Sequence, residues 1–404
     1  MTKRVAVTGL GVVSSLGLSR DAHFDALRNG QSGIGQLPIT DVERLTIKIG
    51  GYARDFDTDQ RFDRSEVALL DRTTQMAVTA AAEAIADSGI ELGEEEQARS
   101  GVVIGTALCG METIDNAYRA VFQEGKNRVH PFLVPRLMAN AGASQISMRH
   151  GLMGPSWTVS TACSSSNHAI GQAFEQVRSG AAPVMIAGGA ECPMAFGVMK
   201  AWEGLRVMSR DNCRPFSKTR SGMVQGEGAA VLVLEEMERA KARGARIWGE
   251  VCGFGMSADA SDIVTPSQDG AARAISTALR QAEMSVDEIA YINAHGTATT
   301  ANDKTECAAI RQVLGAAADR VSVSSTKSMH GHALGGAGAL EAAACMLAMT
   351  EGVIPPTINY EESDPDCDLD VTPNEARQRP VSVALSNSFA FGGLNAVLAF
   401  RDAP

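Results

Sequence analysis

The sequence predicts an α/β protein in which two similar halves follow one another along the chain. Short apolar runs alternate with stretches of helical periodicity from end to end, a pattern typical of buried parallel or mixed sheets covered by helices. The predicted strands are residues 4–8, 101–106, 156–160, 184–188, 229–235, 247–253, 289–293, 320–324 and 381–385. The predicted helices are residues 65–88, 167–179, 269–284, 303–314 and 337–350.

Similar units recur in the same order in both parts of the chain, which indicates an internal duplication. The matching pairs are residues 4–17 with 247–259, 159–171 with 323–335, and 184–189 with 381–387. In the second pair, Cys163 corresponds to Lys327. We therefore predict an N-terminal half over residues 1–245 and a C-terminal half over residues 246–404, with a site at their junction. No linker rich in Pro or Ser separates the halves, so we expect one fused body.

The composition argues against several classes of protein. The 404 residues are 45% hydrophobic and 21% charged, which is typical of an ordered globular chain. The formal net charge of −11 argues against nucleic-acid binding. No apolar run approaches the roughly 20 residues needed to cross a bilayer. The eight cysteines form no CxxC pair, and a strand-like run stands where a signal peptide would be, so we expect a cytoplasmic protein.

Cys163 lies where a β-branched run ends and a helix rich in small residues begins. The thiolate is the reactive form of cysteine, and a helix N-terminus or basic neighbours lower the pKa of the thiol. This position therefore favours an activated nucleophile. The alternative is a buried apolar side chain, which is the common state of an intracellular cysteine.

Two histidines stand in glycine-rich turns that follow apolar stretches. They are His295 and His332. Neutral imidazoles that donate Nε2–H can hold a thioester or carboxylate oxygen as negative charge develops on it. One thiol and two imidazoles suggest acyl chemistry. The alternative is a structural imidazole bonded to a backbone carbonyl, which is what we expect of His23, His130, His150 and His168.

The glycine-rich run 389–395 follows the last predicted strand. Its glycines let the backbone approach a substrate closely, so a backbone N–H of this run can form half of an oxyanion hole. A tight hairpin that needs positive φ angles is an equally good explanation. A metal site is not expected, because His330 and His332 form the only close histidine pair and no cysteine or carboxylate cluster accompanies them.

Four ordered motifs together resemble the elongating β-ketoacyl-acyl-carrier-protein synthases. The motifs are residues 161–165, 293–297, 327–332 and 387–393. The likeness extends over nearly the whole chain, through residues 214–216, 226–228, 255–257 with Asp259, and 338–341. The resemblance implies a thiolase fold, in which two βαβαβαββ halves make a five-layered α/β/α/β/α body that is usually dimeric.

The resemblance also implies a reaction. Cys163 would accept an acyl chain from a carrier protein by thioester exchange. His295 and His332 would promote decarboxylation of malonyl carrier protein and stabilise the enolate oxygen, and the resulting carbanion would attack the Cys163 thioester. No free cofactor is implied, because the substrates arrive on the phosphopantetheine arm of the acyl carrier protein.

Further residues receive supporting roles from the same resemblance. The N–H groups of Cys163 and Phe391 would hold the oxyanion, and Phe391 would gate access to the site. The residues that would organise the histidines are Lys327 and Glu341, and those that would contact phosphopantetheine are Thr297 and Thr299. Candidates for an acyl tunnel are Leu108, Met111 and Met138, although core packing explains each equally well. Candidates for docking an acidic carrier are Arg61, Arg64, Arg206 and Arg210, although any one of them can be a solvated surface charge.

The sequence departs from the family pattern at several positions while it keeps the three catalytic residues. His330 replaces the usual Thr, Ser166 the usual Gly and Leu394 the usual Thr, and residues 217–221 replace a segment where acidic residues are expected. We expect Ser166 and Leu394 to reshape the space near the thioester and His330 to add a polar group beside it. These departures favour a specialised pathway, such as polyene or polyketide synthesis, and pairing with a related non-catalytic subunit.

Two other functions were weighed. A coenzyme-A-dependent thiolase has a similar fold but needs a second cysteine in the C-terminal glycine-rich turn, where this chain has Phe389 and Phe391. A chain-length-determining partner subunit resembles a synthase but lacks the nucleophile. The presence of Cys163 argues against that second alternative.

Overall fold

The computed structural model describes residues 2–403 and contains one large mixed sheet. From one edge to the other, its strands are β10 (Ser322–Ser324), β9 (Tyr291–Asn293), β13 (Val383–Ala390), β14 (Leu394–Arg401), β8 (Gly249–Ala258), β1 (Val5–Ser14), β7 (Gly228–Glu236), β6 (Val184–Glu191), β4 (Gly101–Gly105) and β5 (Ser156–Val159). Two small sheets stand apart, formed by β2 (Ile34–Gln36) with β3 (Ile49–Gly51) and by β11 (Val353–Ile354) with β12 (Arg377–Gln378).

The strand order repeats, with the same topology on both sides of the sheet centre. Each half contributes five strands to the sheet, and we number these five in the order in which they occur along the chain. From the outer edge of the sheet to its centre, the order is third, second, fourth, fifth, first. This order holds from β5 to β1 in one half and from β10 to β8 in the other. The two runs meet where β1 pairs antiparallel with β8, from Val5 opposite Val251 to Val7 opposite Gly249. This repetition is what an internal duplication produces. The boundary at residues 245 and 246 stays a prediction.

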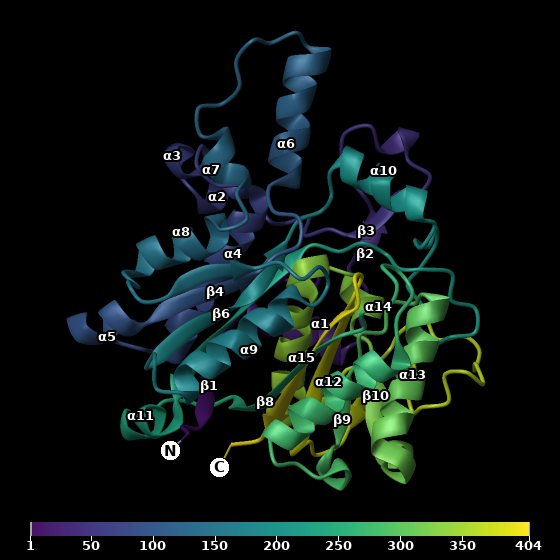
Figure 1. Cartoon of the computed structure of the whole chain (residues 1–404). Coiled ribbons are helices and arrows are strands. Elements are labelled where there is room, and N and C mark those ends of the chain that lie inside the picture. Colours follow the sequence, from purple (N-terminus) through teal and green to yellow (C-terminus); the bar gives the residue numbers. More distant parts are fainter. Residues whose placement is uncertain (1, 404) are drawn as a thin grey trace.

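Helices form three layers around the two halves of the sheet (Figure 1). The central layer contains α9 (Ser165–Arg178) and α15 (Ala337–Glu351), which contact each other and strands of both halves. Outside the N-terminal half, α4 (Arg72–Ser88) packs on β1 and β7, and α8 (Ala141–His150) packs on β4. Outside the C-terminal half, α12 (Gln268–Gln281) packs on β8 and β14 and is flanked by α13 (Thr300–Leu314). The predicted α/β class with five layers is confirmed.

The composition of α15 explains its central position. Every residue from Ala337 to Met349 is buried, and this stretch of the helix is apolar or small on all faces apart from Glu341. A helix that is hydrophobic all round is stable only inside the protein. It therefore fills the space between the two half-sheets, together with the more amphipathic α9.

Two sequence-based boundaries differ from the structure. The predicted helix 65–88 is divided into α3 (Arg64–Val67) and α4, because the Asp71 side chain accepts a hydrogen bond from Thr73 N at 2.9 Å and caps a new helix. The glycine-rich run 389–395 is the turn of a hairpin, in which β13 and β14 pair up to Ala390 and Leu394. Gly392 and Gly393 adopt φ angles of +83° and +68°, which glycine takes without strain. The hairpin alternative is therefore confirmed, and β14 was missing from the predicted strands.

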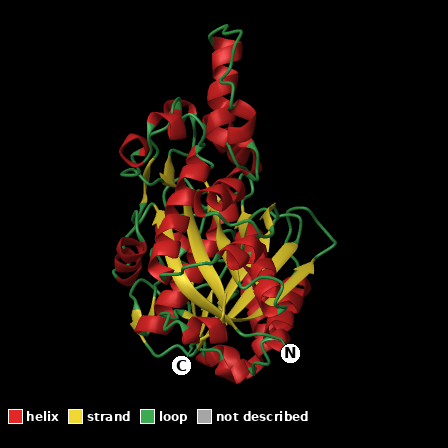
Figure 2. Cartoon of the chain, turned by 90° about the vertical axis from the view of Figure 1, so that its left-hand side faces the viewer, coloured by secondary structure: helices red, strands yellow, loops and turns green. Residues whose placement is uncertain are grey.

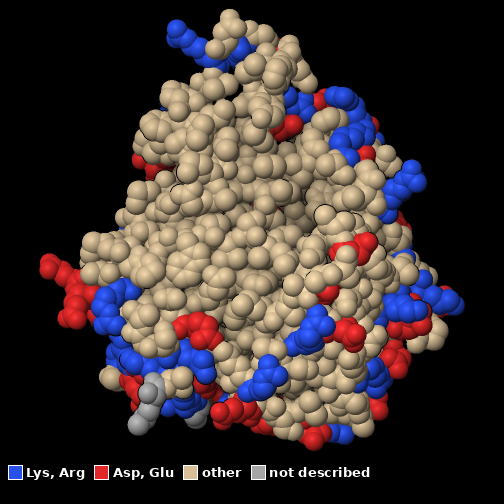
Figure 3. All heavy atoms as spheres, viewed as in Figure 1, with Lys and Arg blue, Asp and Glu red and all other residues tan. Residues whose placement is uncertain are grey.

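A helical arm stands away from the body in both views (Figures 1 and 2). It consists of α6 (Met111–Tyr118), the π-helical turn η2 (Arg119–Gln123) and α7 (Leu133–Leu137). Several of its apolar side chains are exposed, among them Tyr118, Phe122 and Val134. Figure 3 shows a broad face with few charged residues below the arm, with Lys, Arg, Asp and Glu gathered at its lower and right margins. Within residues 2–403, no helix has the length and hydropathy of a membrane span.

Candidate active site

The nucleophile turn joins β5 to α9 through a strained backbone. Ala162, directly before Cys163, has φ +50°, a conformation that costs a residue with a Cβ about 1–2 kcal/mol. The Ser165 hydroxyl supports this turn, because it accepts from Thr161 N at 2.9 Å and donates to Ala162 O at 2.6 Å. Strain of this kind persists only where the surroundings enforce it. The turn presents the Cys163 side chain, 7% exposed, at the start of α9.

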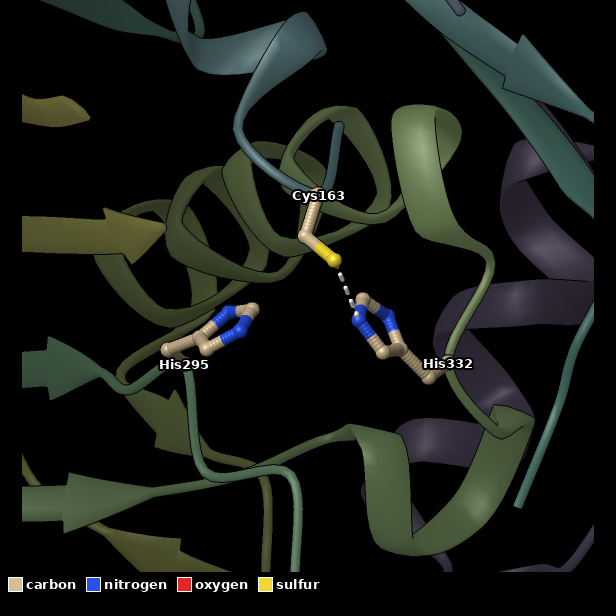
Figure 4. Close-up of side chains that lie close together, drawn as sticks. All are labelled: Cys163, His295 and His332. Atoms are coloured by element: carbon tan, nitrogen blue, oxygen red, sulfur yellow. Dashed lines mark hydrogen bonds between the residues drawn. The ribbon is translucent and has the colours of Figure 1, made fainter. Parts of the chain in front are cut away.

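The two predicted histidines converge on this sulfur (Figure 4). His332 Nε2 lies 3.1 Å from Cys163 Sγ. The His295 and His332 rings stand nearly perpendicular at 82°, with centroids 5.4 Å apart. All three side chains are buried. The structure therefore brings together one thiol and two imidazoles that lie far apart in the sequence.

Backbone contacts hold each histidine in place. His332 N donates to Val224 O at 2.7 Å, just after α14 (Lys327–His330) ends. His295 follows β9, and the buried Glu306 carboxylate accepts from His295 N and Gly296 N, both at 2.8 Å. The sequence did not predict a role for Glu306. Its only local feature is an acidic side chain on the predicted helix 303–314, three residues after Asp303, and such a side chain does not by itself indicate a contact with His295.

Burial and the Lys327 charge set the electrostatics of the histidines. Burial lowers the pKa of His295 and of His332 well below the usual value, and the nearby Lys327 lowers both further. Both rings are thus neutral near pH 7 and can donate one N–H each. This agrees with the protonation state expected from the sequence.

The pKa of Cys163 moves in the opposite direction to our expectation. Burial raises the pKa of the Cys163 thiol to about 12, although the Lys327 charge acts to lower it. The position at the start of α9 also favours the thiolate through the helix dipole. Cys163 is therefore a protonated thiol near pH 7.

Lys327 and Glu341 form an ion pair with both side chains fully buried. Burial raises the pKa of Glu341 to about 7, while the Lys327 ammonium opposes that shift. The two residues come from α14 and α15 of the C-terminal half. The pair therefore places the Lys327 charge near the buried imidazoles of His295 and His332, where it lowers the pKa of both.

A pocket of about 700 Å³, including its mouth, leads to the three side chains. Thr297 and Thr299 line it, and their hydroxyl oxygens lie 2.9 Å apart. Phe391 also lines it and stacks on Trp202 with ring centroids 6.0 Å apart. Residues from both halves surround the pocket, including Val207 and Met223 from the N-terminal half and Asp259, Phe389 and Asn395 from the C-terminal half.

The acyl-tunnel candidates lie in different places. Leu108 packs against the apolar cluster formed by Cys163, Leu334 and Ala390. Met111 begins α6, and Met138 is 43% exposed just beyond α7. The pocket of the single chain is lined by none of the three candidates.

The three residues that depart from the family pattern, His330, Ser166 and Leu394, lie in different surroundings. His330 is fully buried, with Nε2 3.0 Å from Thr326 Oγ1 and its ring 6.1 Å from that of His23, so it lies outside the pocket. Ser166 donates to Gly335 O across the two halves and is also buried. Only Leu394 packs against the cluster that contains Cys163. Core packing therefore removes His330 and Ser166 from the substrate surface.

The segment 217–221 has charge partners of its own. Arg220 pairs with Asp364 at 2.5 Å, and Lys218 pairs with Glu362 at 2.5 Å. The acidic residues missing from this segment are thus supplied by the loop that lies against it. The four predicted docking arginines, Arg61, Arg64, Arg206 and Arg210, are all exposed, and none forms an ion pair with another residue of the range 2–403.

Cys163, His295 and His332 each offer one donor atom, and these atoms lie within 4.8 Å of one another. Zinc accepts thiolate and imidazole ligands of this kind. The same atoms are the reactive groups of the pocket. The expectation that the protein has no metal stays a prediction.

The fold and the site together define a thiolase-fold acyl-transfer enzyme. The model of the β-ketoacyl synthase N-terminal domain matches residues 2–240, and that of the C-terminal domain matches residues 248–361. The chain belongs to the β-ketoacyl synthase family. It is a ketosynthase, an acyltransferase that condenses acyl units in fatty acid or polyketide chain elongation.

Three similar proteins illustrate the range of this family. Nodulation protein E from Rhizobium sp. (strain N33) is 47% identical over 402 residues and both chains are covered completely. The 3-oxoacyl-[acyl-carrier-protein] synthase 2 of Synechocystis is 42% identical, with 99% of this chain and 98% of the relative covered. The solved structure of the ishigamide ketosynthase/chain length factor has a TM-score of 0.94 at 37% identity and covers both chains completely.

Proposed function

We propose that Cys163 carries the growing acyl chain and that His295 and His332 drive its condensation with a malonyl unit. The observation that carries this proposal is the 3.1 Å approach of His332 Nε2 to Cys163 Sγ, with the His295 donor atom within 4.8 Å of both. In the first step Sγ attacks the acyl thioester of the carrier protein. The bond between the acyl carbon and the carrier sulfur breaks, and the carrier thiol leaves with the proton of Cys163.

The second half-reaction uses the imidazoles. The malonyl carboxylate leaves as carbon dioxide, and the electron pair of the broken C–C bond forms an enolate whose oxygen accepts from the Nε2–H groups of His295 and His332. The enolate carbon attacks the Cys163 thioester, and the N–H groups of Cys163 and Phe391 hold the oxyanion. The C–Sγ bond then breaks and Sγ takes up a proton. Burial, and to a smaller extent the charge of Lys327, lowers the pKa of both imidazoles and keeps them neutral, which this role requires.

The substrate arm we propose is phosphopantetheine on an acyl carrier protein. The pocket supports this, because the reactive sulfur lies at its inner end and two threonine hydroxyls, Thr297 and Thr299, line it. The exposed Arg206 stands next to Val207, which lines the same pocket, and suits an acidic carrier. We place the reaction in the cytoplasm, where carrier-bound substrates are available.

A partner subunit is the second part of the proposal. The outermost strand β5 pairs with β4 alone among the described strands, so its other edge is open. The arm carries exposed Tyr118, Phe122 and Val134 beyond the same half. An open edge and an apolar arm suit either a second copy or a related ketosynthase-like subunit. Light scattering of the chain expressed alone, and with such a subunit, distinguishes a homodimer from a heterodimer.

The test separates the two half-reactions. In Cys163→Ala we expect no acylated protein by intact mass and no condensation, while carbon dioxide is still released from malonyl carrier protein. In His295→Ala and His332→Ala we expect the reverse, with acylation retained and carbon dioxide release lost. Cys345→Ala, which removes another buried thiol from α15, is the matched control and should behave as the wild type. Undiminished condensation by Cys163→Ala would refute the mechanism.

The pathway is tested with a panel of acyl carrier proteins. Similarity to nodulation protein E and to a ketosynthase/chain length factor supports a specialised polyene or polyketide pathway. Leu394, which packs against the Cys163 cluster, is the departure placed to influence the accepted chain. We expect Leu394→Thr to change which acyl chain accumulates on Cys163 while carbon dioxide release is unchanged.

A further inference from the structure

A second buried carboxylate, Glu191, lies close to the nucleophile and has no part in the reaction described above. It ends β6 and is fully buried. Within residues 2–403 it forms no ion pair with a Lys, Arg or His side chain. Burial raises the pKa of Glu191 to about 7, because a charged carboxylate is less stable away from water. A side chain that is costly to bury and has no cationic partner calls for a specific explanation.

The hydrogen bonds of Glu191 all point to one short segment. Its carboxylate accepts from Ala107 N, from Leu108 N at 3.1 Å and from Thr106 Oγ1 at 3.3 Å. These groups lie just past the end of β4, where Thr106 N makes the last bond to β5, at Val159 O. The backbone then leaves the sheet and its N–H groups lose their strand partners. Glu191 therefore fixes the course of residues 106–108 after the strand ends.

The same carboxylate lies against the C-terminal half. A Cβ added at Gly335 would lie 2.7 Å from Glu191 Oε2 and 2.3 Å from Ala107 N, so the turn η5 (Leu334–Gly336) presses directly on both groups. Only glycine fits this contact. Glu191 thus joins the end of β4 to a turn from the other half of the molecule.

Both of the joined segments reach the nucleophile. Leu334 of the η5 turn forms an apolar cluster with Cys163 and Ala390, and Leu108 and Ala107 pack against that cluster. The histidines are held independently, His295 through Glu306 and His332 through Val224 O. Glu191 therefore supports the wall beside the sulfur, and among residues 2–403 no hydrogen bond joins it to His295, His332 or Glu306.

We propose that Glu191 is a positioning residue for the acyl half-reaction, in which it holds Leu108 and Leu334 as the wall against which the chain carried by Cys163 lies. This inference rests on the proposed acylation of Cys163. It predicts that a change at Glu191 alters how fast, and with which chain, Cys163 is acylated. It also predicts that carbon dioxide release from malonyl carrier protein is unaffected.

The variants Glu191→Ala and Glu191→Gln test this assignment. Glu191→Ala removes all acceptors, and we expect acylation of Cys163, followed by intact mass, to slow by about 10- to 100-fold, because misplacement of a reacting group by about 1 Å can cost 100-fold. Glu191→Gln keeps the shape and one acceptor oxygen and should restore acylation to within about threefold of the wild type. Measured with short and long acyl carriers, the preferred chain should shift in Glu191→Ala.

Decarboxylation provides the contrast. It is measured as carbon dioxide release with each Glu191 variant placed in the Cys163→Ala background, where we expect a change of less than about twofold, because the supports of both histidines are intact. Glu235→Gln is the matched control, since Glu235 is a fully buried carboxylate at the far end of the neighbouring strand β7. It should leave acylation as in the wild type.

Each result decides the question. Equal loss of acylation and decarboxylation in Glu191→Ala, or unchanged acylation in it, would overturn the positioning role. If Glu191→Ala does not fold, Glu191→Asp carries the same test, because it keeps the charge but falls one methylene short of the Ala107 and Leu108 N–H groups. A wild-type chain that no acyl carrier acylates would instead refute the proposed function, and the two failures are therefore distinguishable.

Discussion

The turn that carries Cys163 and the turn that carries Lys327 occupy equivalent places in the two halves and lie in different environments. In the first, Ser156 at the start of the edge strand β5 is exposed. In the second, the edge strand β10 is fully buried, because residues 355–373 cover it, with Val323 N donating to Asp370 O at 2.8 Å and Thr372 Oγ1 donating to Val323 O at 2.9 Å. The edge strand of one copy is partly exposed in the single chain, and the edge strand of the other is enclosed.

The two turns differ in a way that suits two different requirements, exposure for a reactive group and burial for a fixed charge. A nucleophile needs access and a strained turn that presents it, as at Ala162 and Cys163. A fixed charge needs burial, because water screens exposed charges. The enclosed turn holds Lys327 against Glu341, and the Lys327 charge adds to the effect of burial in lowering the pKa of His295 and His332. The two equivalent turns thus carry different groups, a thiol in one copy and a buried ion pair in the other.

The largest expected effect contrasts the two equivalent residues directly. Lys327→Met leaves the Glu341 carboxylate buried without its cation, and we expect it to lower the free energy of unfolding by about 3–5 kcal/mol. Cys163→Ala should change that free energy by less than about 1 kcal/mol, although it abolishes acylation. Urea unfolding followed by circular dichroism measures both. Equal effects of the two substitutions would contradict the division of tasks.

A double variant sharpens this result. Lys327→Met combined with Glu341→Leu removes both charges and should recover most of the stability lost in Lys327→Met alone. It should not recover decarboxylation, because the fixed charge beside His295 and His332 is still missing. Recovery of both properties would show that the pair has no electrostatic role.

The pH dependence of stability reports on the enclosed turn. The pKa of Glu341 is raised from its usual 4.5 to about 7, so the native state binds more protons than the unfolded state between these values. The contribution of Glu341 to stability is therefore full below pH 4.5 and falls as the pH rises to 7, by at most about 3 kcal/mol. The difference between wild type and Glu341→Gln, measured as urea midpoints from pH 4.5 to 8, should decline across this window. A constant difference would contradict the raised pKa.

A smaller effect is expected at the contact between the two halves. Ser166→Ala removes the hydrogen bond from Ser166 Oγ to Gly335 O and leaves a buried carbonyl with one partner fewer. We expect a loss of about 1–2 kcal/mol in the free energy of unfolding. Ser156→Ala, on the exposed part of β5, is the control and should change it by less than about 0.5 kcal/mol.

The smallest expected effect concerns the strained turn itself. Ala162→Gly relieves the cost of φ +50° but adds freedom to the unfolded chain, so we expect a gain in stability of less than about 1 kcal/mol together with slower acylation. Ala169→Gly, seven residues later inside α9, should instead lose about 1 kcal/mol. Opposite signs in these two variants would establish that the backbone at Ala162 is strained.

Several features were predictable from the sequence because they depend on local pattern. Alternating apolar runs and helical periods indicated the α/β class, and the repeated units indicated the duplication that the two equivalent strand orders reflect. The five layers were implied by the family resemblance. Cys163, His295 and His332 were predicted as one site from their turns, and the structure brings their side chains together. Glu306, the residue that holds the His295 backbone, was missed, because an acidic residue on a helix has no distinctive local signal.

Other features were decided only by packing. Burial between the half-sheets, rather than position along the chain, makes the pKa of the Cys163 thiol higher than its usual value. Packing also removes His330 and Ser166 from the substrate surface and leaves Leu394 beside the nucleophile, although all three appear in or next to recognisable motifs. Short-range pattern thus determines which chemical groups the protein carries and where its strands and helices lie along the chain. The pKa values and the wall around the sulfur depend on long-range contacts between the two halves, which local pattern does not encode.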